Sequence, residues 1–96
     1  MYELYVVFKC KDGAREKFVE RVKAEGILDA ILNEKGCKMY QYFYSDNDKN
    51  LLLLLETWDS KSDQQVHLTQ PHMDKLRAIK GDYILSTTVS ENKPQL

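Results

Sequence analysis

The chain has 96 residues, of which 30% are charged, and a net charge of −1. This length predicts one domain with a modest core, and a dimer would be a natural way to bury more surface. The balanced charge, the absence of a basic stripe with interleaved aromatic residues, and a longest apolar run of only five leucines predict neither a nucleic-acid nor a membrane partner.

The first half of the chain predicts two strands with a helical region between them. Bulky side chains alternate on both faces of residues 2–10, which indicates a strand that is covered on both sides. Two apolar stripes follow, separated by Gly26 and ending near Gly36, and they predict one interrupted helix or two short ones. Residues 37–44 alternate again and form the second predicted strand. One face of that strand carries Tyr40, Tyr42 and Tyr44.

The third predicted strand, residues 51–58, begins with five leucines and ends with a carboxylate and an indole. Glu56 and Trp58 project from the same face, because strand side chains alternate with a period of two. A symmetric hairpin loop before this strand would pair Leu51 with Tyr44. That register places Glu56 on the face opposite the tyrosines of the second strand, and a slip of one residue would reverse the facing.

The rest of the chain predicts two more helical segments, a fourth strand and a polar tail. Ser60 opens a Ser-Lys-Ser-Asp sequence that resembles a capping box, and Pro71 is predicted to begin a further helical turn. Residues 83–90 alternate and are rich in β-branched side chains, which is typical of a strand. We therefore expect a single domain over residues 1–90 and a polar C-terminal tail over residues 91–96.

This order, β-α-β-β-α-β, predicts an α+β fold with the ferredoxin-like split arrangement, in which the helices lie on one face of an antiparallel sheet. The other face must also be covered, because Tyr, Leu and Val populate both faces of most strands. A second copy of the same sheet is an economical cover, so we expect a face-to-face homodimer.

The sequence predicts neither a metal site nor a bound cofactor. His67 and His72 are five residues apart, which is poor helical metal spacing, and no cysteine or carboxylate set completes a site. No Gly-rich phosphate loop or dinucleotide fingerprint is present. Cys10 and Cys37 lack Cys-x-x-Cys spacing, and we expect free thiols in a reducing cytoplasm, with a single disulfide as the alternative.

Several short motifs occur together from the second strand onward. Gly36-Cys37 opens the second strand, which contains Tyr40. The third strand ends in the Leu-Glu-Thr-Trp-Asp sequence of residues 55–59, and His67 follows nine residues after the Trp. Gln70-Pro71-His72 comes next. Together with the element order, these motifs resemble the antibiotic biosynthesis monooxygenase family of small dimeric α/β-barrel proteins.

The resemblance implies a dimeric α/β barrel and a choice among several activities. The family includes cofactor-independent monooxygenases of quinols or phenols, an isomerase of a phosphorylated signalling molecule, and haem-degrading relatives. Haem-degrading relatives use an Asn on the first strand with a Trp and a His, and residues 5–9 contain no Asn, which argues against haem oxidation. Residues 24–33 are longer and more apolar than expected for the first helix of the family, so one pocket wall is expected to differ.

Three residues are the first candidates for the site. His67 could be a general base that removes a phenolic proton near neutral pH, or a structural histidine that caps or hydrogen-bonds within the fold. Glu56 could orient His67 or accept a substrate proton, or it could pair with Arg or Lys across the sheet or the dimer. Trp58 could stack on a planar substrate, or it could belong to the core or to a dimer interface.

Other polar side chains are weaker candidates. Tyr40 and Tyr42 could bind a substrate through their hydroxyls, although a tyrosine face also suits an interface. His72 could line the entrance of a pocket or lie on the surface. Three cations could attract an anionic substrate or form a solvated helix face: Lys75, Arg77 and Lys80.

The leading hypothesis is a cytoplasmic, cofactor-free monooxygenase that uses O2 to oxidise a small phenol, quinol or quinone-like aromatic molecule. An isomerase or other proton-transfer enzyme on the same scaffold would need the same base but no oxygen. A non-catalytic dimer that binds a small molecule or acts in a stress response would need neither. The fold alone does not separate these functions.

Overall fold

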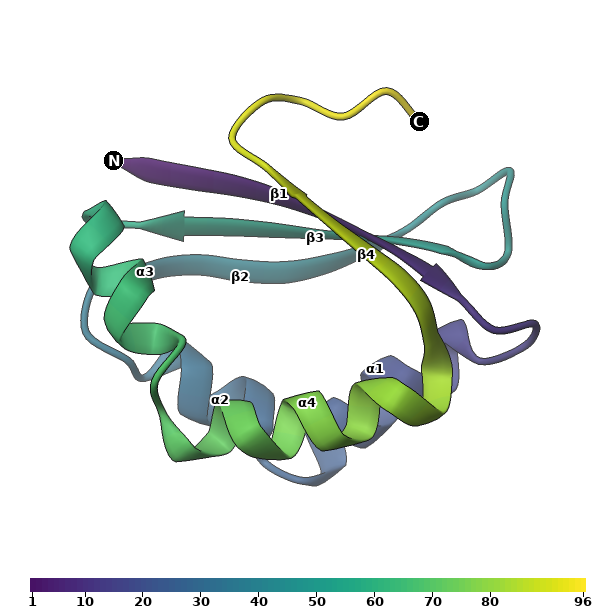
Figure 1. Cartoon of the computed structure of the whole chain (residues 1–96), viewed down its shortest axis with the longest axis horizontal. Coiled ribbons are helices and arrows are strands. Elements are labelled where there is room, and N and C mark those ends of the chain that lie inside the picture. Colours follow the sequence, from purple (N-terminus) through teal and green to yellow (C-terminus); the bar gives the residue numbers. More distant parts are fainter.

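Two layers make up the structure, a computed structural model that describes residues 1–96: a four-stranded sheet and a layer of helices (Figure 1). In chain order the elements are β1 (Tyr2–Cys10), α1 (Arg15–Ala24), α2 (Ile27–Leu32), β2 (Cys37–Tyr44), β3 (Leu51–Trp58), α3 (Lys61–His67), α4 (Pro71–Tyr83) and β4 (Ile84–Ser90). The predicted order is confirmed, and each of the two helical regions consists of two helices.

The strands lie in the order β2-β3-β1-β4, and every neighbouring pair is antiparallel. This is the predicted ferredoxin-like α+β arrangement. β1 and β3 occupy the centre of the sheet, which accounts for their apolar residues at almost every position. Cys10 and Cys37 lie on β1 and β2, which β3 separates, and both thiols are free.

The helices cover only one face of the sheet (Figure 1). On that face β3 places Leu52, Leu54 and Trp58, each no more than 2% exposed. Full burial of a leucine side chain contributes about 1.5–3 kcal/mol to stability, so this face is the main core. The alternate residues Leu51 and Leu53 point to the other face and are only partly buried. That outer face has an apolar centre flanked by polar residues such as Lys9, Gln41 and Thr88, and no helix covers it.

Local signals set the ends of the helices. Gly26 adopts a left-handed φ of 75° and separates α1 from α2, so the region forms two short helices rather than one interrupted helix. The Ser60 hydroxyl accepts a hydrogen bond from the Asp63 amide at 3.1 Å, which confirms the predicted cap of α3. α4 begins at Pro71, as predicted. None of the helices has the length and apolar character needed to cross a membrane.

The predicted register of the β2–β3 hairpin is wrong: the observed pairing is shifted by one residue. Tyr44 pairs with Leu52 instead of Leu51, and Tyr40 lies opposite Glu56. The prediction assumed a symmetric loop. In the structure the Leu51 amide instead donates a hydrogen bond to the Asp48 carbonyl oxygen, which lies within the loop. The slip moves Glu56 onto the same face as Tyr40, beneath the helices.

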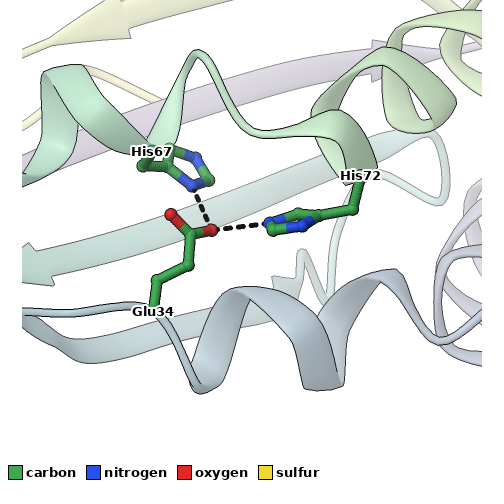
Figure 2. A group of neighbouring side chains, drawn as sticks. All are labelled: Glu34, His67 and His72. Atoms are coloured by element: carbon green, nitrogen blue, oxygen red, sulfur yellow. Dashed lines mark hydrogen bonds and ion pairs between the residues drawn. The ribbon is translucent and has the colours of Figure 1, made fainter.

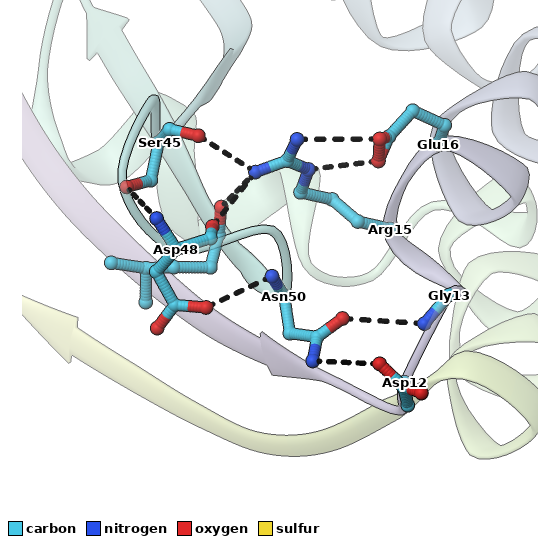
Figure 3. Close-up of polar contacts among 8 residues, drawn as sticks. Asp12, Gly13, Arg15, Glu16, Ser45, Asp48 and Asn50 are labelled. Carbon is cyan, nitrogen blue, oxygen red and sulfur yellow. Dashed lines mark hydrogen bonds and ion pairs between the residues drawn. The ribbon is translucent and has the colours of Figure 1, made fainter.

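Arg15 of α1 holds the hairpin loop in this asymmetric form (Figure 3). Its Nη1 atom donates to the carbonyl oxygens of Ser45, Asp48 and Leu51 at 3.0, 2.9 and 3.2 Å. The guanidinium carbon also lies 4.7 Å from the centroid of the Tyr44 ring. A hydrogen bond from a charged donor contributes about 1.5–3 kcal/mol. The register of the hairpin therefore depends on a side chain at least 30 residues earlier in the sequence.

Candidate functional site

His67 ends α3 and is held against the sheet by aromatic rings. Only 1% of the residue is exposed. Its ring centroid lies 4.7 Å from that of Trp58, with the two planes at 40°, and 5.7 Å from that of Tyr40. Aromatic contacts at these distances are attractive beyond the area they bury. The position of the imidazole is thus fixed on two sides.

Glu34, in the segment between α2 and β2, contacts His67 from a third direction (Figure 2). Its Oε2 atom lies 2.8 Å from Nδ1 of His67 and 2.7 Å from Nε2 of His72. A carboxylate oxygen can only accept, so each of these two nitrogens carries the hydrogen. In a neutral His67 ring the lone pair is then on Nε2, which makes no hydrogen bond within the chain.

A tight turn at Gly36 brings Glu34 over α3. Gly36 has a left-handed φ of 80°, and its carbonyl oxygen accepts a hydrogen bond from the Asp59 amide at 2.8 Å. A Cβ atom at this position would collide with the side chain of Asp63. Glycine is therefore required at position 36 for two reasons: it can adopt the positive φ, and it leaves room for the close approach of the turn to α3.

Glu56 is almost buried, at 7% exposure, and shares the helix-covered face with Tyr40. Its Oε1 atom accepts a hydrogen bond from the indole Nε1 of Trp58 at 3.0 Å. Within the chain it pairs with no Lys or Arg, and its carboxylate does not hydrogen-bond His67, whose partner is Glu34. Burial raises the pKa of Glu56, and the indole hydrogen bond only partly opposes this effect.

A cavity of about 230 Å³ lies between the sheet and the helices α3 and α4. Its walls are mainly aliphatic and aromatic. The polar and charged residues of the lining are Tyr40, Glu56, Gln64, His67, Arg77, Lys80 and Thr87. Typical small-molecule sites have volumes of about 300–1,000 Å³. This cavity is therefore suited to a small ligand of one or two rings.

The structure separates the six residues predicted for the site into two groups. Three line the cavity: Tyr40, Glu56 and His67. Trp58 is fully buried and packs against the His67 ring without reaching the cavity. Tyr42 lines a second cavity of about 240 Å³ beside α1 and β2, and its buried hydroxyl has no hydrogen-bond partner. His72 contacts Glu34 instead of the cavity.

Glu34, His67 and His72 are the side chains best placed to hold a metal ion. One ligand atom from each lies within 4.8 Å of the others. The sequence pattern indicated no carboxylate that would complete such a set, and Glu34 supplies one. Ligand atoms around tetrahedral zinc are about 3.3 Å apart, given bonds of about 2.0 Å. Both imidazole nitrogens are closer than that to Oε2 of Glu34, so the three side chains form a hydrogen-bonded cluster.

Sequence reasoning missed Glu34. It precedes His67 by 33 residues, and nothing in the local pattern connects the two. The only nearby signal was Gly36, which predicted the end of the helical region. Gly36 does form a left-handed turn. The position of Glu34, however, depends on how this turn packs on α3, which the local sequence does not indicate.

The fold and the cavity together define a class of protein: a ferredoxin-like α+β domain with room for a small molecule between its sheet and its helices. Residues 1–78 match the model of the family described as antibiotic biosynthesis monooxygenase. Because the match spans most of the chain, the protein belongs to this family. Among curated proteins, none matches the sequence.

Solved structures of proteins from several organisms share the fold. A Nitrosomonas europaea protein named "putative antibiotic biosynthesis monooxygenase" superposes with a TM-score of 0.79 at 19% identity, over 94% of this chain and 96% of that one. A Bacteroides thetaiotaomicron protein of unknown function, described as a possible oxidoreductase, gives 0.78 at 23% identity, over 92% and 90%. A conserved Methanosarcina mazei protein gives 0.79 at 19%, over 94% and 90%. At these identities the likeness shows the fold alone.

Proposed function

We propose that the protein is a cofactor-independent monooxygenase that oxidises a small phenol or quinol with O2. The observation that carries the proposal is the cavity, which is mainly apolar and has the imidazole of His67 in its wall. Nδ1 of that imidazole is held by Glu34, so the unpartnered Nε2 is available as a base. Family membership supports the same class of reaction.

In the proposed reaction the substrate supplies the electrons and the protein supplies a base and a mainly apolar site. Nε2 of His67 takes the phenolic proton, and the phenolate passes one electron to O2. The phenoxyl radical and superoxide then combine at a ring carbon, and the peroxide takes the proton back from His67. Loss of water, with the proton of that ring carbon, gives a quinone, so phenol plus O2 becomes quinone plus water. The apolar walls would keep other water away from the radical pair.

The neighbouring side chains have separate roles in the proposal. Burial raises the pKa of Tyr40, so its hydroxyl stays protonated and can donate a hydrogen bond to the substrate oxygen. Glu56, whose pKa burial also raises, can accept or return a proton at the same end of the cavity. Trp58 supports both His67 and Glu56 from behind. Tyr42 and His72 are proposed to act indirectly, through Tyr40 and Glu34.

Oxygen uptake tests the proposal. Metal-free and flavin-free protein is mixed with a varied panel of phenols and quinols in an oxygen electrode. We expect uptake above the uncatalysed rate, and a loss of about 10²–10⁴-fold in His67→Gln, as is usual for removal of a general base. Gln65→Ala, at an exposed position on α3, is the matched control and should keep the full rate. No uptake with any member of the panel would rule out the monooxygenase.

A second candidate function is an isomerase or other proton-transfer enzyme. The observation in its favour is that His67 and Glu56 line the same cavity, since a base and a carboxyl group with a raised pKa can form an acid–base pair. Such an enzyme would turn over without oxygen. Exchange of substrate hydrogen with deuterated water under nitrogen, abolished in His67→Gln, would favour it. Ligand binding that survives in His67→Gln, with neither reaction, would indicate the non-catalytic binding protein.

We also propose that the protein is a homodimer that joins through the outer face of the sheet. The centre of that face is Leu53 of β3, with Val7 of β1 on one side and Phe43 of β2 on the other. All three are apolar, and none is fully buried by the chain itself. Large exposed apolar patches usually mark interfaces.

A further inference from the structure

Lys80 of α4 is an unusual member of the cavity wall. The residue is partly buried, and its Nζ atom lies 5.2 Å from the centroid of the Phe8 ring. It forms no ion pair or hydrogen bond within the chain, in contrast to Arg77 one turn earlier. Arg77 donates to Asp74 at 2.9 Å and to the Leu68 carbonyl at 2.6 Å.

We propose that Lys80 forms an anion subsite, which binds a carboxylate or similar anionic group of the substrate at the end of the cavity opposite His67. The inference rests on the proposed function in one respect, namely that the substrate occupies this cavity. It assigns a specificity-determining role to a residue that takes no part in the proton transfer.

The electrostatic setting of Lys80 favours an anion over any other occupant. Burial lowers the pKa of Lys80, and the nearby charge of Arg77 lowers it further. Both effects destabilise the ammonium ion, and both would be relieved by an anion. Thr87 on β4 also lines the cavity, and a threonine hydroxyl can donate to the same group. Arg77 also lines the cavity, but its guanidinium is paired with Asp74, so the cation of the lining without a carboxylate partner is Lys80.

The sheet register separates the two ends of the cavity. Glu56 pairs with Leu4 on β1, and Thr87 pairs with Phe8, which lies beneath Lys80. Four residues along a strand span about 13 Å. The carboxyl group of Glu56 is therefore too distant to serve Lys80 as a partner. The aliphatic side chains of the cavity wall include Leu4, Val6, Leu54, Met73 and Leu76.

This geometry defines a substrate class. The molecule has a planar apolar body, an acidic hydroxyl that reaches His67 and an anionic group at the opposite end that reaches Lys80. para-Coumarate has these three features, and its neutral carboxamide has the same shape without the charge. The pair of compounds therefore isolates the contribution of the anion.

Calorimetric titration of the whole protein with both compounds at neutral pH tests the subsite. We expect the wild type to bind the carboxylate about tenfold more tightly than the carboxamide, which corresponds to about 1.4 kcal/mol. Added salt should reduce this preference. Lys80→Met keeps the apolar stem and should abolish the preference while it retains carboxamide binding, which shows that the variant is folded. Lys75→Met, at an exposed position on α4 outside the cavity wall, should keep the preference.

The outcomes separate this inference from the proposed function. Equal affinities in the wild type, a preference that persists in Lys80→Met, or no binding of either compound would overturn the subsite. Oxygen uptake without the anion preference would support the monooxygenase and contradict the subsite. An anion preference without oxygen uptake or hydrogen exchange would support the subsite and contradict both proposed enzymatic functions.

Discussion

A single carboxylate oxygen orders two histidines beside the cavity. Because Oε2 of Glu34 accepts from both His67 and His72, rotation of either ring breaks a charge-assisted hydrogen bond worth about 1.5–3 kcal/mol. Packing on Trp58 also opposes rotation of the His67 ring. The tautomer of His67 is therefore a property of the cluster and not of the imidazole alone.

Glu34→Gln should weaken the control of this tautomer. The amide keeps the shape of the side chain but loses the charge, so we expect kcat of the oxidation to fall about 10–100-fold with little change in KM. Nitrogen-detected NMR of labelled histidine should show Nδ1 of His67 protonated in the wild type and a mixture of tautomers in the variant. Glu20→Gln, at an exposed position on α1, should change neither quantity. An unchanged tautomer together with an unchanged kcat would contradict the positioning role.

Glu56 should make the free energy of unfolding depend on pH. Its pKa is raised in the folded state from the ordinary 4.5, so the folded protein holds this proton to higher pH than the unfolded chain does. Stability contributed by the protonated group is then complete below about 4.5 and is lost as pH rises from there through the folded pKa. Each tenfold difference in proton affinity between the folded and unfolded states corresponds to about 1.4 kcal/mol. The charges that face Glu56 are those of His67, which lowers its pKa, and Glu34, which raises it.

Glu56→Gln resembles the protonated form and can still accept the hydrogen bond from Trp58. The variant should therefore gain stability relative to the wild type as pH rises from acidic to neutral. Urea unfolding of both proteins across that range measures the difference. Glu3→Gln, at an exposed position on β1, should show no such trend. A difference between Glu56→Gln and the wild type that does not change with pH would show that burial leaves this carboxyl group unperturbed.

Short connections, rather than the long elements, decide the geometry of the site. The Gly36 turn sets Glu34 over α3. The Arg15 contacts hold the hairpin loop (Figure 3), and the register of that hairpin places Glu56 opposite Tyr40. Strands and helices built from apolar repeats tolerate many substitutions of similar volume. A turn with a left-handed residue and no free space does not, because both the backbone and the packing exclude a side chain.

Gly36→Ala should cost more stability than Gly26→Ala. Both glycines have positive φ, so each alanine is strained by about 1–2 kcal/mol. A Cβ at Gly26 meets open space, whereas one at Gly36 collides with Asp63, which adds about 1–3 kcal/mol. Urea unfolding of the two variants measures the excess. The double variant Gly36→Ala with Asp63→Ala should recover part of it, and equal losses in the two single variants would mean that the turn yields to the added methyl group.

At the scale of the whole molecule, the sequence predicts those features whose causes are local. The positions of the strands in the chain follow from the alternation of apolar residues, and the start of α3 follows from the cap at Ser60. His67 was a candidate because its residue type and position fit a base. The hairpin register and the partner of His67 could not be predicted, because Arg15 and Glu34 lie 30 or more residues away from the groups they contact.

The two faces of the sheet differ in what covers them. The helices cover one face of the sheet and leave the other without a helix (Figure 1). The covered face carries the core and the cavity, and the centre of the other face carries apolar side chains. Partners in stable complexes each bury about 800 Å². A sheet face with leucine, valine and phenylalanine at its centre is of the kind that a second copy would bury.

Sedimentation or light scattering at micromolar concentration should therefore give twice the chain mass of 11.3 kDa. Leu53→Asp places a carboxylate at the centre of the proposed interface, where an unpaired charge costs several kcal/mol, and should shift the protein to monomers. Val66→Asp, at a position on α3 that is 56% exposed on the helical side, should remain a dimer. A wild-type protein with the mass of a single chain would contradict the proposed dimer. A Leu53→Asp variant that stays dimeric would mean that the copies meet through another surface and that the apolar sheet face serves a different partner.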